Sequence, residues 1–64
     1  MRRVPTQKPH FDVGDRVRER FPARGTPHIG VVTKRYELHE QYRYVVHFDD
    51  GRDGVFFEWE LAPD

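Results

Sequence analysis

Apolar and polar residues alternate in short runs along much of the chain, and turn-forming residues separate these runs. Alternation with a period of two is typical of strands that bury one face. The pattern predicts strands near residues 15–20, 29–37, 42–48 and 55–57, with a brief last strand after a short 3₁₀ turn in residues 58–64. No run has a sustained helical period, so the sequence predicts an all-β fold.

The segments between the runs have the composition of loops. Residues 21–28 (FPARGTPH) are dense in proline and glycine, residues 37–41 (ELHEQ) are polar, and residues 49–54 (DDGRDG) contain the Asp-Gly pair that favours tight hairpins. Gly30 lies inside the second run, where a glycine indicates a bulge or a close approach of two backbones.

Five short strands in so small a chain favour a closed sheet, because closure removes exposed edges. We therefore expect a small five-stranded barrel. Its expected core consists of Val17, Ile29 or Val31, Val32, Tyr44, Val46, Phe48, Val55, Phe57 and Leu61.

The order of the motifs VGDRVR, IGVV, YVVHFDDG and ELAP resembles that of the SH3-like barrel superfamily, which includes Tudor-like and KOW-type domains and the barrel of nitrile hydratase β chains. The resemblance covers residues 11–63. It implies an SH3-like barrel with a short 3₁₀ turn near the C-terminus. These motifs report a fold, and the same fold hosts many functions.

GDRVR followed by GVVTKRY is also similar to the type II plasmid dihydrofolate reductases, which are tetramers of such barrels around a central pore. That resemblance implies pore residues at Glu19 and along 53–56. The family has a lysine where this chain has Glu19, a glutamine at Gly54 and a tyrosine at Phe56. The donors that position folate and nicotinamide are therefore absent at these positions.

Length and composition limit the other classes of function. The chain has 64 residues, no cysteine and no apolar run long enough to span a membrane. We expect one domain at residues 11–64, a flexible tail at residues 1–10 with no signal-peptide pattern, and a cytoplasmic location.

Charge is divided unevenly along the chain although the net charge is zero. Residues 1–36 contain nine basic and three acidic residues, whereas residues 37–64 contain two basic and eight acidic residues. Within one small fold the two halves interleave, so mutual neutralisation across strands is one interpretation. A molecule with one basic and one acidic face is the other.

The chain has nine aromatic residues, more than a core of this size hides. Alternation predicts that one of Phe56 and Phe57 points outward, and exposed rings beside acids are typical of surfaces that bind proteins. We expect a protein-binding surface, for a partner or for a second copy in a homodimer. Its candidate residues are Tyr36, Tyr42, Phe56, Trp59, Glu58 and Glu60.

A nucleic-acid-binding surface is the alternative hypothesis. Arginines at a period of two on the first strand, near further basic residues on the second, can follow a phosphate backbone. The candidate residues are Arg16, Arg18, Arg20, Lys34 and Arg35. Pairing of the same residues with acids on neighbouring strands is the simpler interpretation.

Other site chemistry has little support in the sequence. The four histidines lie on predicted tail, loop and strand segments without the spacing of a metal site. Asp49, Asp50 and Gly51 are what a hairpin turn requires. The chain has neither serine nor cysteine as a nucleophile. We therefore expect a non-enzymatic chain without metal or cofactor.

Overall fold

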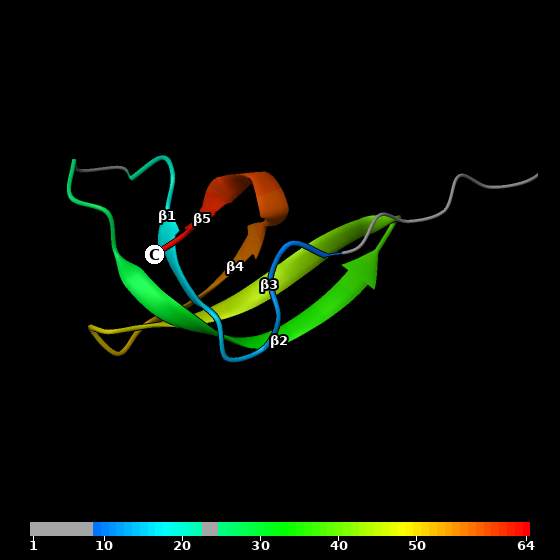
Figure 1. Ribbon diagram of the computed structural model, residues 1–64, viewed down its shortest axis with the longest axis horizontal. Coiled ribbons are helices and arrows are strands. Elements are labelled where there is room, and N and C mark those ends of the chain that lie inside the picture. The colour runs from blue at the N-terminus through cyan, green and yellow to red at the C-terminus, as the bar shows by residue number, and fades with distance from the viewer. Residues whose placement is uncertain (1–8, 23–24) are drawn as a thin grey trace, which may run out of the picture.

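The structure is a computed structural model that describes residues 9–22 and 25–64. It contains five β-strands and one short 3₁₀ helix, as the sequence predicts (Figure 1). The elements in chain order are β1 (Arg16–Glu19), β2 (Ile29–Leu38), β3 (Gln41–Phe48), β4 (Asp53–Phe57), η1 (Glu58–Glu60) and β5 (Leu61–Pro63).

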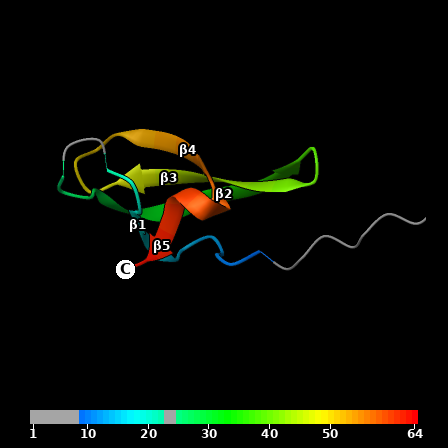
Figure 2. The same ribbon diagram turned by 90° about the horizontal axis from the view of Figure 1, so that it is seen from above.

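All five strands belong to one antiparallel sheet with the order β4-β3-β2-β1-β5. Figure 2 shows β4 along one margin of this sheet, with β3 and then β2 beside it. η1 connects β4 to β5, which returns to pair with β1. The sheet curls but does not close, since β4 and β5 remain its two edges.

Gly30 is the point of close backbone approach that the sequence indicates. It pairs with Val17 on one side and with Phe48 on the other. A Cβ atom at this position would lie 2.4 Å from the carbonyl oxygen of His47 and 2.8 Å from the Cα of Phe48. Only glycine therefore permits the strands to pack as closely as they do here.

A β-bulge in β2 changes which residues face the core. The register shifts between Val32 and Lys34, and the hydroxyl of Thr33 donates to the carbonyl of Val45. A bulge adds one residue to a strand and reverses the alternation beyond it. Tyr36 consequently pairs with Arg43 on the outer face of the sheet, whereas regular alternation from Val32 would turn it inward.

A two-residue turn joins β2 to β3. Leu38 pairs with Gln41, and His39 and Glu40 between them have φ angles of 53° and 63°. Positive φ at both central residues is the conformation of a type I′ turn, which matches the twist of a hairpin and usually contains Asn-Gly. This chain forms the turn without glycine.

Among residues 9–22 and 25–64, seven side chains form the buried core, and six of them were predicted. The core consists of Phe11, Val17, Val32, Tyr44, Val46, Phe48 and Leu61. The prediction is wrong for Val55, which is 54% exposed. It is also wrong for Phe57, which lies on the outer face and is only partly buried.

Phe56 takes the inward place in β4, because Tyr44 pairs with Phe56 and Val46 pairs with Gly54. The Phe56 ring meets Phe48 edge to face at 5.6 Å. Gly54 makes room for that ring, since a Cβ there would lie 2.8 Å from a Phe56 ring carbon. One step of register moves every side chain of a strand to the other face.

The N-terminal segment joins the body of the fold at His10. Its backbone N–H donates to Glu58 Oε2 at 2.9 Å, and Phe11 packs edge to face on Tyr44 at 5.4 Å. Residues 1–8 of the predicted tail lie outside the described residues. Within the described ranges, no helix has the length and apolar character needed to cross a membrane.

Candidate functional site

A groove with a volume of about 690 Å³ runs between the N-terminal segment, η1 and β5. Phe11, Leu61, Ala62 and Pro63 supply most of its apolar lining, and Trp59 stands beside them with 59% of its surface exposed. The remaining lining residues are His10, Arg20 and Glu58. The groove lies within the roughly 300–1,000 Å³ that ligand pockets usually occupy, and it is mostly apolar as they are.

Glu58 holds the N-terminal segment and η1 in place along one side of this groove. Its Oε2 accepts hydrogen bonds from the Tyr44 hydroxyl at 2.6 Å and from the backbone N–H of His10 at 2.9 Å. Burial, and then the hydrogen bond to Glu58, raise the pKa of Tyr44 well above its ordinary value of 10.0. The phenol therefore remains protonated and keeps donating throughout the neutral range.

Arg20 closes the other wall of the groove. Its backbone N–H donates to the carbonyl of Glu60 at 2.9 Å, and its guanidinium Nη1 donates to the carbonyl of Trp59 at 3.4 Å. The same guanidinium lies over the Phe21 ring, 5.2 Å from the centroid. Arg20 thus connects the end of β1 to η1.

An aromatic row, defined here as Phe57, Trp59 and Phe21, continues from the groove onto the outer face of the sheet. Phe57 and Trp59 stack with centroids 6.0 Å apart and an interplanar angle of 8°. Trp59 meets Phe21, which is 65% exposed, at 6.2 Å. The guanidinium of Arg43 lies over the Phe57 ring at 4.7 Å, so a cation covers a ring at each end of the row.

The structure separates the six residues predicted to bind a protein. Glu58 and Trp59 line the groove, and the side chain of Glu60 accepts from the backbone N–H of Phe57 at 2.8 Å. Tyr42 and Phe56 instead pack against the core. Tyr36 lies on the outer face of β2, where Lys34 approaches its ring at 6.0 Å.

Five residues of the groove and the aromatic row were not predicted to bind: Phe57, Phe21, Phe11, Leu61 and Pro63. The outward position of Phe57 could have been inferred from the turn at residues 49–51. The type of that turn sets the register of β4, and the register decides which of Phe56 and Phe57 faces outward. Nothing local in the sequence indicates that Phe21 meets Trp59 or that Phe11 and Pro63 line one groove, since these contacts join segments far apart in the chain.

Most of the basic residues predicted to bind nucleic acid already have partners. Arg16 pairs with Asp49 at 3.0 Å and with Asp64 at 3.7 Å. Arg35 pairs with Asp12. Lys34 and Arg20 lie over aromatic rings.

Arg18 differs from the other four. It lies exposed between Ile29 and Ala62, and it makes no ion pair or ring contact within the described ranges. The nucleic-acid hypothesis stays a prediction.

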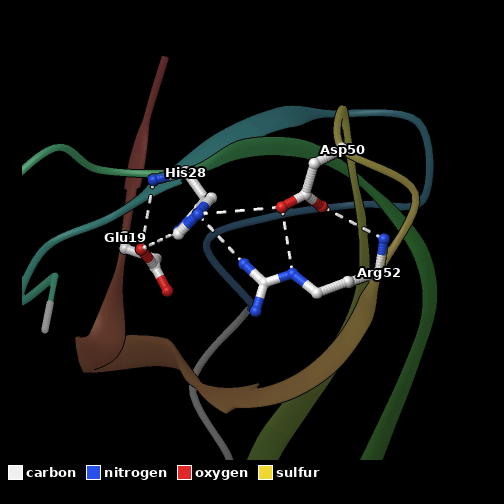
Figure 3. Close-up of polar contacts among 4 residues, drawn as sticks. All are labelled: Glu19, His28, Asp50 and Arg52. Atoms are coloured by element: carbon white, nitrogen blue, oxygen red, sulfur yellow. Dashed lines mark hydrogen bonds and ion pairs between the residues drawn. The ribbon is translucent and has the colours of Figure 1, made fainter. Parts of the chain in front are cut away.

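A second polar cluster connects the end of β1 to the β3–β4 turn (Figure 3). Oε1 of Glu19 accepts from the backbone N–H of His28 at 3.1 Å and lies 3.0 Å from the Nδ1 of that ring. The other ring nitrogen, Nε2, lies 3.0 Å from Nη2 of Arg52. Nε of Arg52 donates to Oδ2 of Asp50 at 2.9 Å.

Nδ1 of His28 therefore faces the carboxylate of Glu19, and Nε2 faces both Arg52 and, at 3.7 Å, Oδ2 of Asp50. Burial opposes the ionisation of Glu19, but hydrogen bonds from His28 and the nearby positive charges outweigh it and lower the pKa of the carboxyl below 4.5. Hydrogen bonds from the backbone and side chain of Arg52 lower the pKa of Asp50 below 3.8. Both nitrogens of His28 are engaged, so we interpret the cluster as a clamp between two loops.

Comparison with protein-family models, with curated proteins and with solved structures gave no match to this chain. Among residues 9–22 and 25–64, no group of three or more histidines and acids is arranged to hold a metal ion. The groove and the aromatic row are therefore the candidate site of this chain.

Proposed function

We propose that this chain is a small non-enzymatic interaction module with SH3-like architecture, and that it binds an extended segment of a partner protein in the groove beside Trp59. The observation that carries the proposal is an exposed tryptophan on the wall of an open, largely apolar groove. Exposed aromatic rings are the commonest anchors of protein interfaces, because they bury a large area and lose little conformational entropy.

The charges around the groove favour an apolar, uncharged segment. Glu58 already accepts from Tyr44 and His10, and Arg20 already contacts the Phe21 ring and the carbonyl of Trp59. A charged side chain entering the groove would have to displace these contacts. An apolar side chain between Phe11, Trp59 and Leu61 gains burial and displaces none of them.

The architecture supports the SH3-like assignment at the level of topology. Five antiparallel strands follow one another as a meander, a 3₁₀ turn follows β4, and the last strand returns to pair with the first. The resemblance of the motifs in the sequence points the same way.

The test is a selection of random peptides displayed on phage against the intact chain. Trp59 is the single tryptophan, so its fluorescence reports binding at the groove directly. We expect selected peptides to be apolar, to shift this emission, and to bind the Trp59→Phe chain at least several-fold more weakly. Backbone NMR shifts on binding should concentrate at residues 10–11 and 58–63.

Val13→Ala is the matched control, because Val13 is 61% exposed and does not line the groove. It should bind the selected peptides as the unaltered chain does. Peptides that bind the Trp59 variant with unchanged affinity, or whose NMR shifts lie away from the groove, would contradict the proposal.

A further inference from the structure

The free edge of β4 presents backbone groups that its only neighbour, β3, does not use. The backbone N–H of Phe48 donates to the carbonyl of Arg52 at 2.8 Å. In an antiparallel pair, such hydrogen-bonded positions recur at every second residue. The backbone groups of Asp53, Val55 and Phe57 therefore point away from β3, toward the free margin of the sheet. Figure 2 shows β4 along that margin.

Of these three residues, only Phe57 has its N–H satisfied, by the Oε1 of Glu60 at 2.8 Å. The N–H groups of Asp53 and Val55 have no partner within the described ranges. The sheet's other edge differs, because on β5 the N–H of Leu61 donates to the carbonyl of Glu58 and Pro63 has no N–H. Free edge donors therefore lie on β4.

β4 also lacks the features that usually protect an edge strand. Natural edges carry lysine, proline or a bulge that prevents pairing with another chain. Val55, at the centre of β4, is instead apolar and 54% exposed, and its register with β3 is unbroken from Asp53 to Phe57. An open, regular and apolar edge favours the addition of another strand.

We propose that β4 pairs with β4 of a second copy of this chain, antiparallel and about a twofold axis at Val55. In that register Val55 faces Val55 of the second copy, and the two exchange both backbone hydrogen bonds. Asp53 faces Phe57 of the second copy and donates its N–H to that carbonyl. A full hydrogen-bonded pair would also have the N–H of Phe57 donate to the carbonyl of Asp53 of the second copy, but Glu60 already holds that N–H, so each of these two outer pairs contributes one hydrogen bond.

Charge complementarity selects a second copy as the occupant. Arg43 lies over the Phe57 ring, and its buried Nε has no hydrogen-bond partner within the described ranges. The twofold axis places Asp53 of the second copy opposite Phe57, on the same face of the sheet as Arg43. Each dimer contains two such rows, in which Phe57 lies between Arg43 and Asp53 of the second copy. Within each copy, Nδ1 of His47 lies 2.7 Å from Oδ1 of Asp53 and holds the position of that carboxylate.

This surface is separate from the groove, which β4 does not line. The two surfaces adjoin at Phe57, which stacks on Trp59, but the dimer contact leaves the groove lining free, so either proposal can hold without the other. The contact is small, so we expect a weak dimer that forms at high protein concentration.

Sedimentation equilibrium and charge exchange test the proposal. The unaltered chain should approach twice its mass of 7.7 kDa as its concentration rises. Asp53→Arg and Arg43→Asp place like charges together in their own homodimers, so each should associate at least tenfold more weakly. An equimolar mixture of these two variants restores both opposite-charge contacts and should associate again.

Asp64→Arg makes the same change of charge beyond β5, at the other margin of the sheet, and should dimerise as the unaltered chain does. Amide hydrogen exchange gives a readout that needs no variant, since exchange at Asp53 and Val55 should slow as the concentration rises. A chain that stays monomeric at its highest soluble concentration, or a mixture no more associated than its components, would overturn the proposal.

Discussion

The hydroxyl of Tyr44, a fully buried residue in the middle of β3, donates a 2.6 Å hydrogen bond to the carboxylate of Glu58 at the start of η1. The same carboxylate oxygen accepts from the backbone of His10. One acid therefore joins the core, the N-terminal segment and the turn that carries Trp59, and the shape of the groove depends on it.

Tyr44→Phe should lower the free energy of unfolding by about 1–3 kcal/mol, because it removes a hydrogen bond to a charged acceptor while keeping the ring in the core. Urea denaturation measures this change. The emission of Trp59 should also shift, since η1 loses one of its anchors. Unchanged stability would show that the hydroxyl contributes nothing net to the fold.

The raised pKa of Tyr44 makes stability depend on alkaline pH. Its folded pKa lies above the unfolded value of 10.0, so its contribution is fully present below pH 10.0 and is lost as the pH rises toward the folded pKa. The difference in unfolding free energy between the unaltered chain and Tyr44→Phe should therefore be constant below pH 10.0 and shrink above it. Urea titrations on both sides of that pH measure the difference, and a gap that widened instead would contradict the assignment.

Glu19 produces the opposite dependence at acid pH. Its folded pKa lies below 4.5, so its contribution is present above pH 4.5 and is lost as the pH falls through the folded pKa. At neutral pH, Glu19→Gln should lower the free energy of unfolding by about 1 kcal/mol, because it replaces a charged acceptor. At strongly acid pH, where Glu19 is itself protonated, the variant and the unaltered chain should be equally stable. Thermal unfolding over this range checks the trend. Asp64→Asn is the control, because it removes an acid that lies outside this cluster, 3.7 Å from Arg16.

The strands were predictable from the sequence because alternation and turn residues are local signals, and the bounds of β2 and β3 differ from the predicted ones by a residue. The face of β4 was not predictable from alternation, since the run from Val55 to Phe57 is apolar on both faces. Its register is set by the turn after Phe48, where Gly51 has a φ of 95°. The geometry of this turn therefore decides which face of β4 is buried, because the hydrophobic pattern allows either face.

The groove was only partly predictable for a different reason. Glu58 and Trp59 were predicted to bind, because they are an acid and an aromatic residue outside any clear core pattern. The opposite wall comes from Phe11, which the curl of the sheet brings against Tyr44. Likewise, Tyr36 faces outward because of the bulge between Val32 and Lys34, and no residue type in β2 indicates that bulge. Such placements follow from long-range packing rather than from local composition.

The β2–β3 turn offers a gain in stability. His39 and Glu40 adopt left-handed conformations that cost other residues more than they cost asparagine and glycine. The double substitution His39→Asn with Glu40→Gly should raise the free energy of unfolding by about 0.5–1 kcal/mol. Thermal denaturation measures the gain, and a clear loss of stability would show that the native side chains make contacts that outweigh the strain of the turn.

Substitution of Gly30 and of Gly54 tests how tightly the sheet is packed at each position, because the two losses of stability can be compared. At Gly30 an added methyl group would meet backbone atoms of His47 and Phe48, which cannot move without opening the sheet. At Gly54 it would meet the Phe56 ring, which can rotate away. Gly30→Ala should therefore destabilise by about 1–3 kcal/mol or more, and Gly54→Ala by less. Denaturant midpoints of the two variants give the order, and a larger loss at Gly54 would mean that the Phe56 ring is held more tightly than the strands themselves.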